Sequence, residues 1–445
     1  MEHDGRGGPL IGPELAAPPS LKSTKAHSLM TSSDAGHYRR PRTPAPIRAL
    51  NWLGRSVGRD GAAWIKIDPQ QLIQQAEKTT GLRDWGKEPL MEPLSVLCAS
   101  LNNEARPNVV GRMVMRQFLG RILEYRLLMQ RDFAQHPEIL DVEIRRPVFI
   151  TGLPRTGSTL LQRLMARDPD VRWLATWEMM FPSPPPDDAT VATDPRIKLA
   201  DRRLKMLNWA APDFVMAHEL AVGEPEECIS LLQSTLVSNA YELMNELAGY
   251  RAWFKEQDLA DPYRYYKRQL QLLAWKRPRD HWVLKCPVHL FALDAILEVF
   301  PDATIIQTHR DPVTVMPSVC SLFSVVQTLL SDYADPRVLG KEWLDRWAQA
   351  CDDAIDLRAR VGDERFIDIA YKETVRNPIA TVRSIYERRD EPFTPAAEAA
   401  MQGWMQQNPQ HKHGKHVYRL EDYGLNESMV RQRFGRYREH FAAYI

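Results

Sequence analysis

The sequence predicts an α/β fold in which helices flank a P-loop-like parallel sheet, with a helical N-terminal region before the sheet and a helical insert within it. Short apolar runs recur along the chain, long helical patterns separate them, and the first run leads directly into a glycine-containing turn. The chain has 445 residues, of which 44% are hydrophobic and 26% charged. This length suits one large domain or two smaller ones.

The charges almost balance, with 58 Lys and Arg against 57 Asp and Glu, which gives a net charge of +1. Nucleic-acid-binding proteins usually carry a strong excess of basic over acidic residues, so we expect no nucleic-acid partner. A local basic pocket for a small anion is still compatible with this composition.

The five cysteines are scattered and never occur in CxxC spacing: Cys98, Cys228, Cys286, Cys320 and Cys351. This argues against a disulfide framework or a zinc site and favours a reducing compartment. The N-terminus carries no secretory signal pattern. We also expect no apolar stretch long enough to cross a bilayer, and therefore a soluble, cytoplasmic protein without a transmembrane segment.

The N-terminal third divides into two parts. Residues 1–47 are rich in Gly, Pro, Ser and charge without apolar periodicity, which predicts a disordered tail. Residues 48–146 are predicted to be helical. Within them, DPQQLIQQAEKTTG (68–81) has an Asp-Pro start and a Gly end, and 111–137 has apolar residues at helical spacing.

The core is predicted over 147–445. Four apolar runs are expected to form buried strands, the last being the weakest: PVFIT (147–151), HWVLK (281–285), ATIIQT (303–308) and FIDIA (366–370). Helical patterns at 225–248 and 288–300 lie between them. The block at about 187–280 is too long for a simple crossover, so we expect a helical insert over the strand ends, where ligands bind in such folds.

The turn after the first strand matches a phosphate-binding loop except at one position. Gly152, four residues, Gly157, Ser158 and Thr159 follow the pattern, but Ser158 occupies the place of the usual lysine. Backbone N–H groups and the helix dipole can hold an anion in such a turn, and Arg155 can add two parallel hydrogen bonds. The loop therefore suits a phosphate-like group other than the γ-phosphate of ATP.

These residues resemble those of the sulfotransferases. PRTGST (154–159) is similar to the loop P-[KR]-[ST]-G-[ST]-[ST] that binds the 5′-phosphosulfate of the donor, and THRDPVTVMPS (308–318) resembles the segment that binds its 3′-phosphate. Segments such as TGLRDWG and YGLNESMVRQRFGRYREHF look like those of the large bacterial and actinobacterial branch. The likeness covers nearly all of the chain after the tail.

The resemblance implies 3′-phosphoadenosine 5′-phosphosulfate as co-substrate and no metal. Its implied binding residues are Arg155, Thr156, Gly157, Ser158 and Thr159 in the loop, Arg310 and Ser318 for the 3′-phosphate, Tyr371 near the adenine, and Lys415 in a closing loop. Two anionic ends on one donor suit two separate basic groups on the protein.

Three residues are candidates for the proton transfer and charge stabilisation. Glu178 is the first choice for the base, because related enzymes with the Arg-type loop carry a Glu in this zone, about two positions earlier. His218 near an acidic turn is the second candidate, although a structural hydrogen bond is its ordinary alternative. Lys285 ends a strand on the same edge of the sheet and could stabilise the leaving oxygen.

The sequence thus favours an enzyme that moves a sulfuryl group to a hydroxyl or amine by in-line displacement. The acceptor, a small molecule, a lipid or a carbohydrate, is not identified, and a homo-oligomer is left open. Side chains of the insert that could line its site are Trp209, Phe214, Met216, Tyr241, Trp253 and Phe254. The alternatives are a P-loop kinase or nucleotidase with an atypical loop, and a non-catalytic nucleotide-binding pseudoenzyme.

Overall fold

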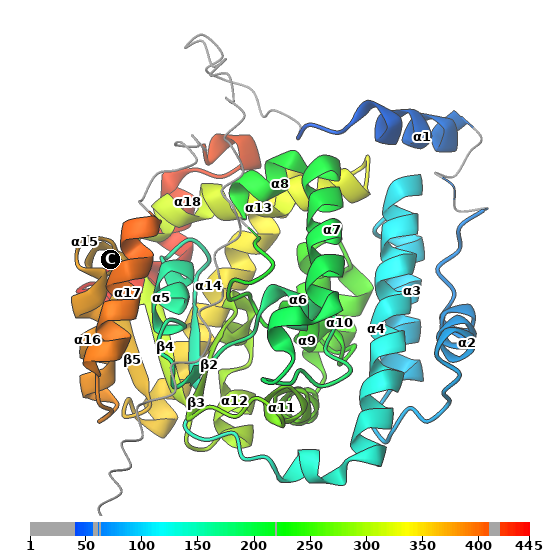
Figure 1. The fold of residues 1–445 in the computed structure, drawn as a ribbon. Helices are drawn as coiled ribbons and strands as arrows, with labels where there is room; N and C mark the ends of the chain where they lie inside the picture. The colour runs from blue at the N-terminus through cyan, green and yellow to red at the C-terminus, as the bar shows by residue number, and fades with distance from the viewer. Residues whose placement is uncertain (1–40, 57–60, 62–63, 219, 409–418) are drawn as a thin grey trace, which may run out of the picture.

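The computed structural model of the protein describes residues 41–56, 61, 64–218, 220–408 and 419–445. Its centre is a five-stranded parallel sheet in the order β2-β3-β1-β4-β5 (Figure 1). The strands are β1 (Val148–Gly152), β2 (Val171–Arg172), β3 (His281–Lys285), β4 (Thr304–His309) and β5 (Phe366–Ala370). The predicted α/β class and all four predicted strands are confirmed. The two-residue strand β2 was not predicted, because it is too short to form a pattern.

Strand β1 lies between β3 and β4, and its register places the expected site residues at one edge of the sheet. Ile150 pairs with Lys285 on β3, and Gly152 pairs with Thr308 on β4. Because the strands are parallel, the segments that follow β1, β3, β4 and β5 leave the sheet at the same carboxyl edge. Ligands bind at this edge in open α/β sheets.

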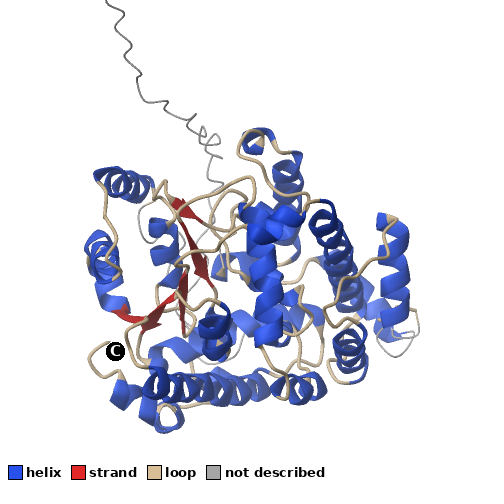
Figure 2. Cartoon of the chain, turned by 90° about the horizontal axis from the view of Figure 1, so that it is seen from below, coloured by secondary structure: helices blue, strands red, loops and turns tan. Residues whose placement is uncertain are grey.

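Helices cover both faces of the sheet (Figure 2), because successive residues of each strand point to opposite faces. Phe149 and Ile305 belong to one apolar core, while Val148 and Ile150 belong to another with the buried residues of α5 and α16. The helices that follow or flank the strands are α5 (Ser158–Met165), α6 (Thr176–Met180), α12 (Leu293–Val299), α13 (Pro312–Leu330), α14 (Pro336–Val361), α15 (Tyr371–Arg376), α16 (Pro378–Arg388), α17 (Pro395–Gln407), α18 (Glu427–Arg433) and α19 (Gly435–His440).

The N-terminal region is helical: α1 (Ala45–Ser56), α2 (Pro69–Thr80), α3 (Met91–Asn103) and α4 (Val109–Gln135). Helix α1 begins before residue 48, the predicted start of this region. Helix α2 has the predicted ends: the Asp68 carboxylate accepts a hydrogen bond from the N–H of Gln71, and Gly81 ends the helix in the left-handed conformation. Helices α2, α3 and α4 share an apolar core with residues of the insert.

Between residues 187 and 280 the chain forms α7 (Pro195–Ala210), α8 (Pro212–Ala217), α9 (Ile229–Gln233), α10 (Ala248–Lys255) and α11 (Ala260–Ala274). The long helix suggested at 225–248 is wrong. Helix α9 has only five residues, and after it Leu236 adopts a φ of 64°. The Thr235 hydroxyl donates to the carbonyl of Leu232, and the Ser238 hydroxyl accepts from the N–H of Ala240. These side chains stabilise turns in place of a continuous helix.

Helix α13 also corrects an expectation. Of the described helices, it is the one that is long and apolar enough to cross a bilayer, with a mean hydropathy of 1.7. In the fold it packs against α4, α14 and α18, and half of it is buried. The expectation that no apolar stretch is long enough to cross a bilayer is therefore wrong as far as length and composition go. In the fold, however, this helix belongs to the packed core.

Candidate active site at the carboxyl edge of the sheet

The predicted anion loop connects β1 to α5 through three left-handed residues. Gly152, Arg155 and Gly157 have φ angles of 129°, 68° and 86°. A Cβ on Gly152 would lie 2.5 Å from the carbonyl oxygen of Thr308, so the close approach of β4 requires glycine there. Gly157 is the N-cap residue of α5 and provides no side-chain cap. This leaves the positive end of the helix dipole facing the loop.

The loop is fixed to the neighbouring strand by hydroxyl groups. The Thr156 hydroxyl lies 2.7 Å from the carbonyl oxygen of Leu153, to which it donates, and 2.6 Å from the Thr308 hydroxyl. The Thr308 hydroxyl in turn lies 3.1 Å from the carbonyl oxygen of Thr151. Thr156 is completely buried, so its side chain positions the loop. Ser158 is buried at the start of α5, whereas Arg155 and Thr159 are exposed.

Arg310, which follows β4, lies beside the loop. Its Nη1 donates to the carbonyl of Arg155 at 3.0 Å, and its guanidinium lies 4.0 Å from the centroid of the Tyr371 ring. A Cβ on Gly157 would lie 3.2 Å from Cδ2 of Tyr371. Arg155, Gly157, Arg310 and Tyr371 are therefore brought together, although they come from three strand ends.

Two other predicted residues are not joined to this group. Ser318 is half-buried on α13, and its hydroxyl forms no hydrogen bond with another described residue. Lys415 lies outside the described residues.

The strand end that carries Arg310 is held by a buried network. His309 lies 2.9 Å from the Asp368 carboxylate and 3.0 Å from the Tyr437 hydroxyl, and the Phe441 ring stacks on it. Two hydrogen bonds of 2.7 Å join Arg358 to Asp368. Burial lowers the pKa of His309 despite this carboxylate. The C-terminal helix α19 thus fixes the position from which Arg310 projects.

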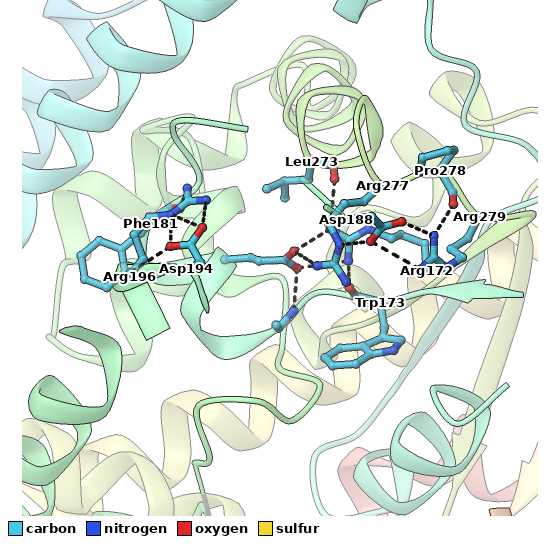
Figure 3. Close-up of polar contacts among 12 residues, drawn as sticks. Arg172, Trp173, Phe181, Asp188, Asp194, Arg196, Leu273, Arg277, Pro278 and Arg279 are labelled. Carbon is cyan, nitrogen blue, oxygen red and sulfur yellow. Dashed lines mark hydrogen bonds and ion pairs between the residues drawn. The ribbon is translucent and has the colours of Figure 1, made fainter. Parts of the chain in front are cut away.

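Glu178 does not occupy the position expected of a base. Its side chain is completely buried and forms ion pairs with Arg172 at 2.8 Å and Arg277 at 2.6 Å. It also accepts a hydrogen bond from the N–H of Ala175. Figure 3 shows Arg172 and Arg277 within a larger polar cluster that includes Asp188. Both carboxylate oxygens are thus engaged in a buried ion-pair network, so the proposed base is His218 and not Glu178.

The other two candidates each pair with an acid of the turn before α9. His218 Nε2 lies 3.1 Å from Glu226, and the Lys285 Nζ lies 2.6 Å from Glu227. Burial lowers the pKa of His218, but the Glu226 carboxylate outweighs it and the pKa is raised. Burial also lowers the pKa of Lys285, but the carboxylates of Glu227 and Glu226 have the larger effect, so this pKa is raised as well. Lys285 therefore stays charged in a buried position.

Sequence reasoning missed Glu226 and Glu227 as site residues, because acids after Pro225 suggested the first turn of a helix. Helix α9 instead begins at Ile229, and the two acids pair with His218 and Lys285. The Glu226 carbonyl accepts a hydrogen bond from Gln162 of α5, and its N–H donates to Leu174. The available signal was the sequence Gly-Glu-Pro at 223–225, with His218 before it and Glu226 and Glu227 directly after it.

A cavity of about 490 Å³ lies next to these residues. We call it the central cavity. Its lining includes Pro154 of the loop together with His218, Glu226 and Glu227. Apolar side chains form most of the remaining wall: Phe118, Met129, Leu322, Phe323, Val326 and Leu330. This size and lining are typical of a site for an apolar small molecule. Among the insert residues expected to line an acceptor site, Phe214 does so.

A magnesium site of the kind used by P-loop kinases finds little support in the described residues. Asp311, the carboxylate considered for that role, accepts a hydrogen bond from the N–H of Val313 at the start of α13, and its carboxylate lies 3.8 Å from Arg438. No group of three or more His, Cys, Asp or Glu side chains in the described part of the chain could hold a metal ion.

Comparison with known proteins shows consistent similarities. The model of the sulfotransferase family matches residues 147–395. Sulfotransferase STF1 from Mycobacterium tuberculosis H37Rv is 34% identical, with a TM-score of 0.75 over 82% of this chain and 98% of that chain. Sulfotransferase STF9 from Mycobacterium avium is 31% identical, with a TM-score of 0.77 over 84% of this chain and 96% of that chain.

Among curated proteins, the omega-hydroxy-beta-dihydromenaquinone-9 sulfotransferase Stf3 of Mycobacterium tuberculosis (strain CDC 1551 / Oshkosh) is 25% identical over 266 residues. The match spans 54% of this chain and 62% of that relative. The same protein of Mycobacterium bovis matches equally well.

Proposed function

This chain belongs to the sulfotransferase family, and we propose that it transfers a sulfuryl group from 3′-phosphoadenosine 5′-phosphosulfate to the hydroxyl of an apolar acceptor in the central cavity. One observation carries the proposal. The cavity that could hold the acceptor is lined by both the loop residue Pro154 and the His218–Glu226 pair. An acceptor in the cavity thus meets both the anion loop and a candidate base.

The residues of the carboxyl edge fit the donor. The glycine turn at 152–157 leads into the N-terminus of α5, which has no side-chain cap and can receive an anion. Arg155 is exposed in this turn, and Arg310 beside it is held over the Tyr371 ring. We propose Arg155, Gly157, Ser158 and Thr159 for the 5′-phosphosulfate. Arg310, with Ser318 and the ring of Tyr371, is proposed for the 3′-phosphoadenosine end.

His218 is proposed as the general base. In its neutral form it accepts the proton of the acceptor hydroxyl as the oxygen bonds to sulfur, while the sulfur–oxygen bond to the donor phosphate breaks. Glu226 stabilises the imidazolium that forms, as the raised pKa of His218 indicates. Lys285 ends the strand next to β1 and stays charged, so it is proposed to stabilise negative charge on the leaving oxygen.

The lining of the central cavity favours an apolar alcohol over a sugar. Carbohydrate sites need many hydrogen-bond partners, whereas most of this wall is apolar. The relative Stf3 is named for a hydroxylated menaquinone, which agrees with an apolar acceptor. The kinase alternative is not favoured, because Ser158 replaces the essential lysine and Asp311 caps α13.

The proposal is tested by turnover with labelled donor and a panel of acceptors. We expect label transfer to long-chain, isoprenoid or sterol alcohols and none to free monosaccharides. His218→Asn should lower kcat by about 100-fold or more, while binding of adenosine 3′,5′-bisphosphate is unchanged. Transfer to sugars alone would contradict the acceptor class. Binding of the bisphosphate without turnover on any acceptor would favour the pseudoenzyme alternative.

A further inference from the structure

Helix α1 carries apolar side chains on its outward face. Its inward stripe consists of Ile47, Asn51 and Gly54, and the Asn51 carboxamide accepts a hydrogen bond from the N–H of Val110 at the start of α4. Trp52 and Leu53 point away from this stripe and are 62% and 47% exposed. The helix is therefore apolar on the side where a helix of a soluble domain is normally polar.

Helix α7 repeats this arrangement. Leu199, Arg202, Met206 and Trp209 recur at intervals of three, four and three residues, so they form one stripe along the helix. All four are exposed, and Met206 and Trp209 keep 59% and 55% of their surface in contact with solvent. The inward residues of α7 are Ala200 and Leu204.

The two helices lie at the same end of the molecule (Figure 1). Arg42, just before α1, donates from its backbone N–H and its Nε to the Asp213 carboxylate at 2.6 and 2.8 Å. Asp213 lies in the first turn of α8, directly after α7. At the other end of α1, Arg55 pairs with Asp332, which follows α13. Helix α1 is thus held between the α7–α8 corner and the end of α13.

The central cavity reaches this end of the molecule. Leu207 of α7 and Val114 of α4 line the cavity, and Val114 is also exposed to solvent. Leu207 directly follows the exposed Met206. The apolar outer surface of α1 and α7 therefore lies at the end of the molecule where Leu207 and Val114 line the central cavity.

Most of the charged side chains on both helices are basic. Helix α1 contains Arg48 and Arg55 and no acid, and α7 carries five Lys or Arg residues against Asp201. Trp side chains next to basic residues are favoured at the interface of a bilayer, where the ring lies among the headgroups and the cations meet anionic lipid.

We propose that the outward faces of α1 and α7 dock on an anionic lipid bilayer and draw an apolar acceptor from it into the central cavity. The face consists of Leu50, Trp52, Leu53, Met206 and Trp209, with Arg48 and Arg202 beside them. The role of the cavity in this inference rests on the proposed function, but docking does not depend on turnover.

Flotation with phosphatidylcholine vesicles, with and without phosphatidylglycerol, tests the docking. The full-length protein should float with vesicles that contain phosphatidylglycerol. Trp52→Ser with Trp209→Ser should weaken this binding about tenfold or more, because it removes the two interfacial anchors. Arg48→Glu with Arg202→Glu should remove the preference for the anionic lipid.

The control changes two exposed apolar residues at the opposite edge of the sheet. Leu140 precedes β1 and Val361 precedes β5, and they are 40% and 41% exposed. Leu140→Ser with Val361→Ser should leave vesicle binding unchanged. Because the assay contains neither donor nor acceptor, its failure leaves the proposed function intact. Equal binding by the Trp double variant would overturn the proposal. The proposal would also fail if the wild-type protein did not bind vesicles but formed a dimer that the two Trp substitutions dissociate.

Discussion

The Thr156 hydroxyl lies 2.6 Å from the Thr308 hydroxyl, so the anion loop after β1 is joined to the strand that leads into Arg310. Both side chains are completely buried. The two basic groups proposed for the donor therefore belong to one rigid unit, and their spacing is set by a pair of threonines that contact no solvent.

The first prediction concerns this threonine pair. Thr308→Val keeps the shape of the side chain but leaves the Thr156 hydroxyl with one partner fewer. We expect the free energy of unfolding to fall by about 1–2 kcal/mol and the affinity for adenosine 3′,5′-bisphosphate to fall with it. Denaturant unfolding and titration calorimetry measure the two changes. Thr314→Val, at an exposed position of α13, should change neither. Unchanged affinity in Thr308→Val would show that the pair does not position the loop.

The second prediction separates a structural role of Glu178 from a catalytic one. Glu178→Gln leaves Arg172 and Arg277 without a negative partner in a buried site, which should cost about 3–5 kcal/mol of stability. Well below the melting temperature, kcat of the folded protein should change by only a few fold. A loss of about 100-fold in kcat with unchanged stability would restore Glu178 as the base.

The third prediction concerns the acid limb of the pH–rate profile. His218 must be neutral to accept a proton, so kcat/KM should rise with pH through its folded pKa, which lies above the usual value of 6.5. Glu226→Gln removes the negative charge that raises this pKa. We therefore expect the acid limb of Glu226→Gln to move to lower pH, with a lower plateau. Measured profiles in which the limb does not move would exclude His218 as the titrating base.

The same pair predicts how stability depends on pH. The pKa of His218 is raised on folding, so its contribution is complete below the unfolded pKa and is lost as pH rises through the folded pKa. The pKa of Glu226 is lowered by His218 although burial opposes this, so its contribution is lost as pH falls through the folded value. His218→Asn should therefore destabilise the protein most at about pH 5–6 and least at alkaline pH. Denaturant unfolding across pH measures this, and a pH-independent loss would contradict it.

A further prediction concerns a variant that fills the central cavity. Val326 lines it from α13, on the wall formed with Leu322 and Leu330. Val326→Trp should raise the KM for an apolar acceptor about tenfold or more, because the larger side chain occupies the acceptor's space. The affinity for adenosine 3′,5′-bisphosphate should stay within about twofold, since the loop is not altered. Steady-state kinetics and calorimetry distinguish the two effects. A rise in donor KM alone would show that the cavity holds the nucleotide.

The parts of the fold and of the site that could be predicted are those that depend on local sequence. The buried strands were recognisable because each is a short apolar run, and the loop because glycine is required where β4 approaches Gly152. The contacts of Glu178 were not predictable, since Arg277 lies 99 positions away and only the fold brings it near. The partnership of His218 with Glu226 depends in the same way on a turn whose helix begins later than the Pro225 signal suggested. Burial and long-range ion pairs, which decide the role of an acid, leave no mark in local sequence.

Arg155 and Arg310 are proposed to hold the two anionic ends of one nucleotide without a metal ion. The most direct test is the melting temperature of the protein with adenosine 3′,5′-bisphosphate in the presence of a chelator. We expect a clear rise for the wild-type protein, no rise for Arg155→Ala or Arg310→Ala, and a full rise for the control Arg360→Ala at an exposed site on α14. A wild-type protein whose melting temperature rises only when magnesium is restored, or both of whose arginine variants respond normally, would contradict the claim.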